Sequence, residues 1–261
     1  MTMKLTVLGA IALLPGLAQL SGSPGPAEKV APRQHRPIVD RLEHGDGTTT
    51  SGNWSGYAVT GTGFTRASGS WVVPKAKCSS GTQYASFWVG LDGYSSNTVE
   101  QTGTDSDCAS GSPRYYAWYE FYPNPSFQIT SLTIKAGDVI SAKVVYSSSK
   151  FTVTIKDVTT GKSFSKSATV SSAKRTSAEW IAEAPSSGRI LPLADFGTVL
   201  FGKDSTAVTS TCTAASTAHT GAIGTFSSIE EITMEKSAVK EAIPSGLSSD
   251  GTSFSVTWAA K

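Results

Sequence analysis

Short apolar runs that alternate with glycine-rich turns constrain the fold of this chain more than any other feature. From Asn53 onward, segments rich in β-branched and aromatic residues are separated by turn signals such as Gly61-Thr62-Gly63 and Ala136-Gly137-Asp138. Strands at this spacing, with little helical periodicity, predict an all-β antiparallel sandwich of two sheets. Residues 170–179 hint at a turn of helix. The expected strands span residues 54–60, 68–73, 84–91, 98–103, 115–122, 129–134, 139–146, 151–157, 163–170, 178–184, 193–201, 229–234 and 252–258.

The N-terminal 50 residues differ from the rest of the chain. Lys4 precedes an apolar run from Leu5 to Leu20, which is followed by small residues and prolines. This order is typical of a secretory signal peptide, so we expect residues 1–27 to direct export and the product to be extracellular. Residues 28–50 are polar and rich in arginine and proline, which predicts a propeptide or flexible leader. Residues 51–261 are expected to form one domain.

The charge balance of the expected domain excludes some partners. The whole chain has 22 basic and 20 acidic residues, and removing the first 50 residues takes away five and four of them, which leaves 17 against 16. A nearly neutral domain gives no electrostatic reason to bind nucleic acid or an anionic membrane. No segment after the signal is long and apolar enough to cross a membrane. We expect a monomer.

The cysteines and histidines limit the chemistry. Three cysteines fit an oxidising compartment, but their spacing matches no zinc pattern. His219 is the one histidine after residue 50, so neither a metal site nor a Ser-His-Asp triad is expected, and no cofactor is predicted. Cys78 and Cys108 lie in loops beside neighbouring expected strands, which favours a disulfide between them and leaves Cys212 unpaired. Three pairings are arithmetically possible.

Aromatic and acidic side chains alternate onto the same strand faces. In the segment from Tyr116 to Pro123, one face carries Tyr116, Trp118, Glu120 and Tyr122. Such a strip suits a cleft that grips an extended polymer, although a half-exposed strand with Glu120 in solvent is an equally good explanation of this strand alone.

Two further segments have the same character. Between Tyr84 and Asp92 one face is apolar, and the other carries Trp88 and Asp92. On 178–184, Glu179 and Glu183 flank one isoleucine on a single face, for which plain solvent exposure is the simpler explanation.

Together these segments resemble the glutamic peptidases, the eqolisin family, first known from fungi as pepstatin-insensitive acid endopeptidases. The resemblance implies a concanavalin A-like, lectin-like sandwich of two antiparallel sheets, with the active site on the concave face. The matching motifs, in chain order, are Asn53-Trp54-Ser55-Gly56, Val73-Pro74, Phe87-Trp88-Val89-Gly90-Leu91-Asp92-Gly93, Gln101-Thr102-Gly103, Ala117-Trp118-Tyr119-Glu120-Phe121-Tyr122-Pro123 and Ala178-Glu179-Trp180-Ile181-Ala182-Glu183, with a weaker one at Asp195-Phe196.

The resemblance also implies roles for individual residues. The catalytic glutamine falls on Gln101 and the catalytic glutamate on Glu183, with Glu179 as the nearest rival. The residues that correspond to those lining or supporting the cleft, where protein or peptide substrates bind, are Trp88, Asp92, Trp118 and Glu120. Tyr116 stands in the same cleft, where fungal members have an acid. We therefore expect peptide hydrolysis at acidic pH that extends to higher pH than in the fungal relatives.

The chemistry of this pair separates the competing hypotheses. Glu183 can deprotonate a water and return the proton to the leaving amine, while the Gln101 amide donates to the developing oxyanion. A non-catalytic carbohydrate-binding sandwich does not need that pair, and a glycoside hydrolase would replace Gln101 with a second acid. The sequence therefore favours a secreted endopeptidase over a lectin or a glycosidase.

The leader suggests a latent precursor. It carries three arginines and two histidines that we expect near cleft carboxylates such as Asp92 and Glu120 at neutral pH; they are Arg33, Arg36, Arg41, His35 and His44. Protonation of the carboxylates below about pH 4–5 should loosen that hold. Activation on acidification, with loss of the leader near Thr50, is the expected outcome.

Overall fold

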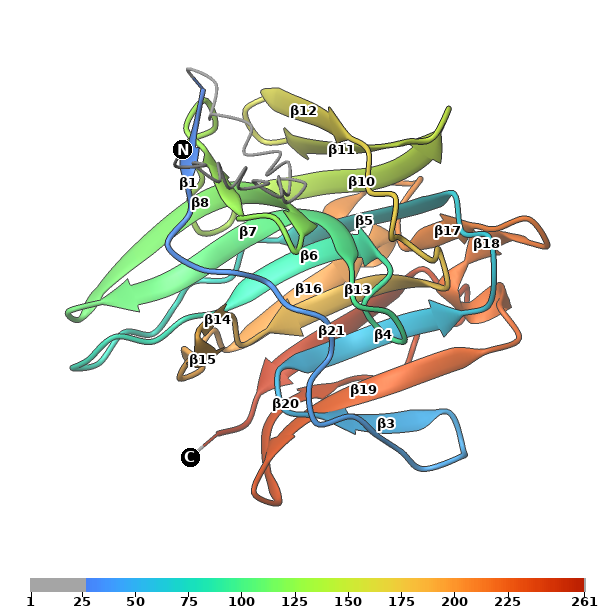
Figure 1. Ribbon diagram of the computed structural model, residues 1–261. Helices are drawn as coiled ribbons and strands as arrows, with labels where there is room; N and C mark the ends of the chain where they lie inside the picture. The colour runs from blue at the N-terminus through green and yellow to red at the C-terminus, as the bar shows by residue number, and fades with distance from the viewer. Residues whose placement is uncertain (1–26, 261) are drawn as a thin grey trace, which may run out of the picture.

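The computed structural model describes residues 27–260 as two large sheets packed face to face (Figure 1). The predicted signal peptide lies outside the described residues, apart from Ala27. The expected β-sandwich is confirmed, since strands make up nearly all of the regular structure. The helices of the described part are one turn of α-helix, α1 (Lys203–Thr206), and one 3₁₀ turn, η1 (Ile223–Thr225).

The first sheet runs from the leader to the centre of the domain. Apart from β3, which is parallel to β19, the neighbouring strands are antiparallel. In spatial order the strands are β1 (Glu28–Val30), β9 (Phe127–Ile129), β8 (Ser112–Tyr122), β7 (Val99–Ala109), β6 (Ser86–Leu91), β13 (Ser177–Glu183), β4 (Trp54–Thr60), β19 (Ile229–Lys236), β3 (Thr48–Ser51) and β2 (Leu42–Glu43).

The second sheet covers one face of the first and joins it where β20 pairs with β19. Two short strands, β17 (Thr213–Ala215) and β18 (Thr220–Ala222), extend it beside β5, and a separate hairpin is formed by β14 (Ser186–Ser187) and β15 (Arg189–Ile190). In spatial order its main strands are β12 (Ser163–Ala168), β11 (Lys150–Asp157), β10 (Val139–Ser147), β5 (Arg66–Val72), β16 (Thr198–Gly202), β21 (Ser253–Trp258) and β20 (Val239–Pro244).

The core lies between the two sheets. The apolar face predicted for 84–91 enters it, and Phe87 and Val89 are fully buried there. Trp180 points into the same layer, and its indole N–H donates to Ser68 O of the opposite sheet at 2.8 Å. Because alternate side chains point to opposite faces, this arrangement places the neighbours of Trp180 on the outer face of the first sheet. The inward and outward faces therefore follow the predicted alternation.

Three parts of the chain differ from the expected elements. Strand β7 continues to Ala109, beyond the expected end at 103. Residues 170–176 form no helix, and the single α-helical turn lies at α1 instead. The leader contributes strands β1, β2 and β3, which differs from a flexible leader, one of the two expected alternatives; the propeptide alternative stays a prediction. Thr50, near which its removal is expected, lies inside β3.

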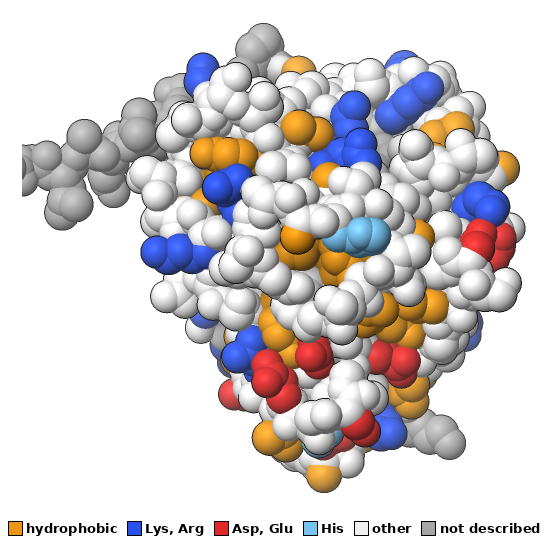
Figure 2. All heavy atoms as spheres, turned by 90° about the vertical axis from the view of Figure 1, so that its right-hand side faces the viewer, with side chains coloured by type: hydrophobic (Ala, Val, Ile, Leu, Met, Phe, Trp, Pro, Cys, Tyr) orange, Lys and Arg blue, Asp and Glu red, His pale blue; other side chains and the backbone are white. Residues whose placement is uncertain are grey.

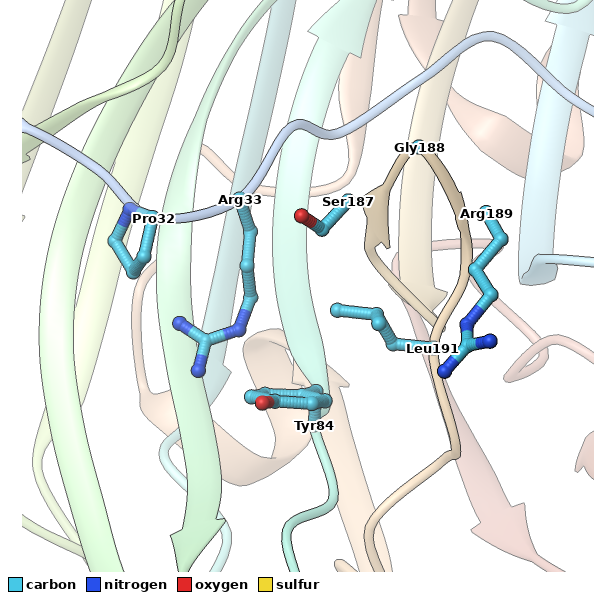
Figure 3. A pocket seen from close by; sticks show the side chains of 7 residues that line it. All are labelled: Pro32, Arg33, Tyr84, Ser187, Gly188, Arg189 and Leu191. Carbon is cyan, nitrogen blue, oxygen red and sulfur yellow. The ribbon is translucent and has the colours of Figure 1, made fainter.

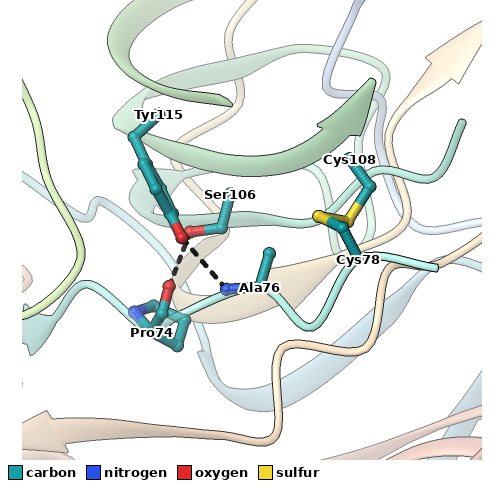
Figure 4. Close-up of a disulfide and its surroundings, with 6 residues drawn as sticks. All are labelled: Pro74, Ala76, Cys78, Ser106, Cys108 and Tyr115. Carbon is teal, nitrogen blue, oxygen red and sulfur yellow. Dashed lines mark hydrogen bonds between the residues drawn. A yellow bond between two sulfur atoms is a disulfide. The ribbon is translucent and has the colours of Figure 1, made fainter. Parts of the chain in front are cut away.

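The predicted disulfide is confirmed. Cys78 and Cys108 are bonded (Figure 4). Cys212 is free and buried. Side chains reinforce the same region, because Ser106 Oγ donates to Pro74 O at 3.1 Å and Ala76 N donates to Tyr115 Oη at 3.2 Å. The segment before Cys78 is thus held against β7 and β8.

The surface is sparsely charged. On the face drawn in Figure 2, most side chains are uncharged, and the basic groups, some of which adjoin acidic ones, form no single continuous basic patch. Charged residues make up 16% of the chain, in keeping with this appearance. None of the helices in residues 27–260 has the length and apolar character needed to cross a membrane.

Candidate active site

The outer face of the first sheet carries the predicted site residues. Strand pairing sets Gln101 of β7 opposite Glu120 of β8, and it sets Glu183 of β13 opposite Trp54 of β4. We call this surface the cleft face and define it by Trp88, Gln101, Trp118, Glu120 and Glu183. All five side chains are buried, because the leader covers them.

Two glycines make room for the large side chains of the cleft face. A Cβ on Gly103 would lie 2.6 Å from Trp88 Cβ and 2.9 Å from Trp118 Cζ2, so a side chain there would displace both indoles. A Cβ on Gly90 would lie 2.9 Å from Trp88 Cζ3 and 3.2 Å from Gln101 Cβ. Glycine therefore allows Trp88, Trp118 and Gln101 to pack side by side.

The leader crosses the cleft face from β1 to β3 (Figure 1). The imidazole of His35 stacks on Trp118, with ring centroids 3.5 Å apart and an interplanar angle of 6°. Main-chain hydrogen bonds hold the leader on both sides of this ring, because Gln34 exchanges two with Ser186 and Ile38 N donates to Gly93 O. The leader is bound as an extended peptide.

Gln101 and Glu183 contact opposite ends of one peptide group. The Gln101 Nε2 atom donates to His35 O at 2.6 Å, and Arg36 N donates to Glu183 Oε1 at 3.1 Å. The carbonyl oxygen of residue 35 and the amide nitrogen of residue 36 belong to the same bond. The pair that sequence motifs suggested is therefore brought together across β6, around the His35–Arg36 peptide bond.

Neighbouring groups orient both side chains. Glu120 Oε2 accepts from His35 N at 2.8 Å and from Gln101 Nε2 at 3.2 Å. Both neighbours, His35 O and Glu120 Oε2, are acceptors, so the NH₂ group of the Gln101 amide, and not its oxygen, has to occupy this position. On the other side, Trp88 Nε1 donates to Glu183 Oε2 at 2.8 Å and fixes that carboxyl.

Burial dominates the protonation of these acids. Removal from water raises the pKa of Glu183 well above its ordinary value, and the nearby Glu120 raises it further, while the Trp88 hydrogen bond opposes the shift. Burial likewise raises the pKa of Glu120, against the hydrogen bond from the His35 amide. With the leader in place, both carboxyls are driven toward the protonated form.

Arg33 of the leader occupies a separate recess of the cleft (Figure 3). Its guanidinium lies over the Tyr84 ring, 3.8 Å from the centroid, and Nη2 lies 3.1 Å from Asp107 Oδ2. The Nη1 atom donates to Tyr116 Oη at 3.0 Å. A hollow of about 550 Å³ adjoins this recess, beside the hairpin that carries Ser187 and Arg189.

Tyr116 is joined to an acid that the sequence reasoning missed. Its hydroxyl donates to Asp105 Oδ2 at 2.6 Å, and Asp105 lies directly opposite it on β7. Burial raises the pKa of Asp107 to about 9, and the neighbouring Asp105 adds to the shift while Arg33 opposes it. Two carboxyls of the adjacent strand, those of Asp105 and Asp107, therefore lie near Tyr116. Alternation from Gln101 through Asp105 to Asp107 would have revealed them.

Glu179 lies opposite Gly90, in the same row of the sheet as Gln101, whereas Asp92 lies just beyond the end of β6. Asp92 accepts from the backbone N–H groups of Lys174, Arg175 and Thr176 at 2.7–3.0 Å, which fixes the loop before β13. Glu179 is buried near Asp92 and Glu100, and burial together with these two acids raises its pKa. Asp92 therefore supports the loop, and Glu183 is distinguished from Glu179 by its hydrogen bond to the same peptide group that Gln101 contacts.

The basic residues of the leader only partly follow the expected pattern. Arg33 meets Asp107, and the main chain of His35 meets Glu120, as expected for a leader that contacts cleft acids. Arg41 instead donates to Tyr94 O and lies over the Tyr94 ring. Among residues 27–260, no group of three or more His, Cys, Asp or Glu side chains is placed to hold a metal ion.

Comparison with known proteins agrees with this fold. Residues 52–246 match the model of the Peptidase A4 family, and the chain belongs to that family. The resemblance to the glutamic peptidases seen in the sequence is thus confirmed.

Two curated relatives are similar over part of their length. Aspergillopepsin-2 from Aspergillus niger is 34% identical over 184 residues, which cover 60% of this chain and 65% of the relative. Scytalidopepsin B from Scytalidium lignicola is 38% identical over 141 residues, covering 52% of each protein. The chain spans just under two thirds of the first relative and about half of the second.

Solved structures extend the similarity to the whole sandwich. A crystal structure of scytalido-glutamic peptidase with a transition state analog inhibitor has a TM-score of 0.68 and 27% identity, covering 79% of this chain and 98% of that chain. The crystal structure of aspergilloglutamic peptidase from Aspergillus niger has a TM-score of 0.58 and 31% identity, covering 67% and 99%. The fold is that of the glutamic peptidases.

Proposed function

We propose that this protein is a secreted glutamic endopeptidase that hydrolyses peptide bonds of protein substrates with a water activated by Glu183. The observation that carries the proposal is the contact of Gln101 and Glu183 with the two ends of one peptide group. A related structure, scytalidopepsin B of the eqolisin family, is described in complex with the tripeptide Ala-Ile-His. Export by residues 1–27 and a monomeric state are parts of the proposal.

In this mechanism Glu183 acts first as a base and then as an acid. Its carboxylate takes a proton from water as the oxygen attacks the carbonyl carbon, and it returns that proton to the leaving nitrogen. The carboxyl already lies beside the amide nitrogen of a bound peptide, so the same group is placed for the second transfer. Trp88 holds one carboxyl oxygen, which leaves the other directed at the reacting bond.

Gln101 stabilises the charge that develops on the carbonyl oxygen. Its amide N–H is 2.6 Å from a peptide oxygen in a site closed to solvent, where such a dipole is worth more than in water. Glu120 keeps that amide in place and receives the N–H of the preceding residue. Trp118 supplies a flat surface for the side chain of that residue, and Tyr116 contacts the residue two positions before it.

The contacts of the leader favour a peptidase over the two other candidate functions. A lectin or a glycosidase recognises sugar hydroxyls, whereas this cleft holds an extended polypeptide through main-chain hydrogen bonds at Gln34 and Ile38. The amide of Gln101 also stands where a glycosidase would need a second acid.

Hydrolysis of denatured casein over a pH series, with and without pepstatin, tests the proposal. Cleavage that is strongest in acid and unaffected by pepstatin is the expected result. The Glu183→Gln variant should lose at least about 10²-fold in rate, the usual effect of removing a general base, while Glu179→Gln serves as the matched control. If Glu179→Gln abolishes hydrolysis while Glu183→Gln remains active, Glu179 is the catalytic acid and the assignment of Glu183 is wrong. If the parent protein cleaves casein at no pH, a binding protein is favoured.

A further inference from the structure

The leader lies in the cleft as an extended chain with contacts on both sides of a single peptide bond. Before that bond, Gln34 N and O pair with Ser186, and His35 N donates to Glu120. After it, Trp54 Nε1 donates to Arg36 O at 3.1 Å and Ile38 N donates to Gly93 O. The leader is thus hydrogen-bonded at the His35–Arg36 peptide group and on both sides of it.

We infer that the His35–Arg36 bond is a self-cleavage site, at which the catalytic pair of this chain hydrolyses its own leader. The inference rests on the proposed function and adds the position of the first cut. The carbonyl oxygen of this bond faces the Gln101 donor, and its nitrogen faces the Glu183 carboxyl. If the leader ran in the opposite direction, the peptide N–H would face the Gln101 NH₂ group, and the peptide oxygen would face the Glu183 carboxylate.

The cleavage step balances with water as the only co-reactant. Water oxygen bonds to the carbonyl carbon of His35 while Glu183 takes one water proton, and Gln101 hydrogen-bonds the resulting oxyanion. The carbon–nitrogen bond then breaks as Glu183 returns its proton to Arg36 N. The products are a chain that ends in the His35 carboxylate and a chain that begins with the Arg36 amine.

The two sides of the cut are held by different parts of the protein. The segment that ends at His35 is held by pairing of β1 with β9 and by the bond of Ala31 N to Ser126 O. The segment that begins at Arg36 is held by Val39 N on Asn53 Oδ1 and by β3 in the sheet. The cut therefore leaves the downstream segment covalently joined to the domain, and it leaves the upstream segment held by noncovalent contacts alone.

Protonation of His35 favours departure in acid. The ring is fully buried against Trp118, between Glu183, whose Oε2 lies 3.3 Å from Nδ1, and the neighbouring Arg33. Burial lowers the pKa of His35 well below its ordinary value, and the Arg33 charge lowers it further. Burial also raises the pKa of Glu120 and of Glu183, so neither acid supplies a full counter-charge to a protonated His35, and the cut uses the ionised fraction of Glu183. Below the ordinary histidine pKa of about 6.5, a released segment gains a proton that the bound segment excludes, so its binding weakens.

The test is to purify the full chain at neutral pH and then acidify it in water enriched in oxygen-18. Mass spectrometry should reveal a new N-terminus at Arg36 and one heavy oxygen in the His35 carboxylate. The cleavage rate should not depend on protein concentration, because the bond and the catalytic pair belong to one chain. Glu183→Gln should abolish this cut, and Glu179→Gln should keep it.

An Arg36→Pro variant gives a second readout, because proline has no N–H for Glu183 and makes a poor leaving amine. It should lose the 35–36 cut at least about 10²-fold without unfolding. For the parent protein, casein hydrolysis with the 35–36 bond intact, or with a first cut elsewhere such as near Thr50, would overturn the inference and leave the proposed function standing. Absence of both casein and leader cleavage would refute both together.

Discussion

Replacement of Gln101 by alanine should reduce kcat by about 10²–10³, which corresponds to about 2.7–4 kcal/mol in the barrier. The magnitude follows from the geometry, because a single buried amide donates to the peptide oxygen at 2.6 Å. The substitution also removes the Gln101 Nε2 donor that lies 3.2 Å from Glu120 Oε2. Without that donor, the repulsion between ionised Glu120 and ionised Glu183 is less well compensated.

The assay is steady-state cleavage of a casein-derived peptide, with thermal unfolding as the control for folding. A Gln101→Glu variant keeps the size of the side chain and separates donation from packing. Its carboxyl donates only when protonated, so its activity should be very low near neutral pH and recover in part in acid. If Gln101→Ala retains kcat within about threefold of the parent value, or if Gln101→Glu shows no acid recovery, oxyanion stabilisation by this residue is refuted.

Three further predictions follow from groups away from the reacting bond. Replacing Cys78 and Cys108 by alanine should cost about 3.5 kcal/mol in the chain-entropy treatment of a loop this long, and lower Tm by roughly 7–14 °C; an unchanged Tm would contradict that account. The pKa of Glu179 is raised in the folded protein, so its contribution to the free energy of unfolding is fully present below the ordinary glutamate pKa and is lost as pH rises through the folded pKa. Glu179→Gln should therefore reduce the fall of Tm above about pH 5. Parallel curves of Tm against pH for the variant and the parent would exclude Glu179 as the cause of that fall. Asp92→Asn should cost about 1–3 kcal/mol, since an amide NH₂ would face backbone N–H groups, while kcat stays nearly constant; a large fall in kcat at unchanged Tm would instead place Asp92 in substrate binding.

The sequence predicted the central strands because their alternation is strong. In β6 the apolar side chains Phe87 and Val89 enter the core, and Trp88 faces the cleft, as the period of two requires. Strand β7 was predicted too short, since Asp105 and Asp107 have low strand propensity and gain their place from pairing with β8. The strand propensity of a segment does not include the stabilisation that comes from pairing with another strand.

The candidate site could be predicted only in part. Motif resemblance singled out Gln101 and Glu183, which lie on strands separated by β6 and whose side chains contact one peptide group of the leader. The short strands of the leader were missed, because Glu28–Val30 pairs with a strand far along the chain, and Thr48–Ser51 pairs with the distant β19 and with the two-residue strand β2. A sequence read without those partners has no signal for an ordered leader.

The parallel pairing of β3 with β19 has a consequence for any shortened form of the protein. Residues Glu231–Met234 bond to β3 on one side, and removal of Thr48–Ser51 would leave that row of backbone donors and acceptors open. Ile232 and Met234 are fully buried there, so an apolar edge would be uncovered together with the unpaired backbone. Open edges of this kind recruit strands from other molecules. A chain begun at Gly52, the start of the family match, should therefore self-associate, whereas one begun at Arg36 keeps its edge closed.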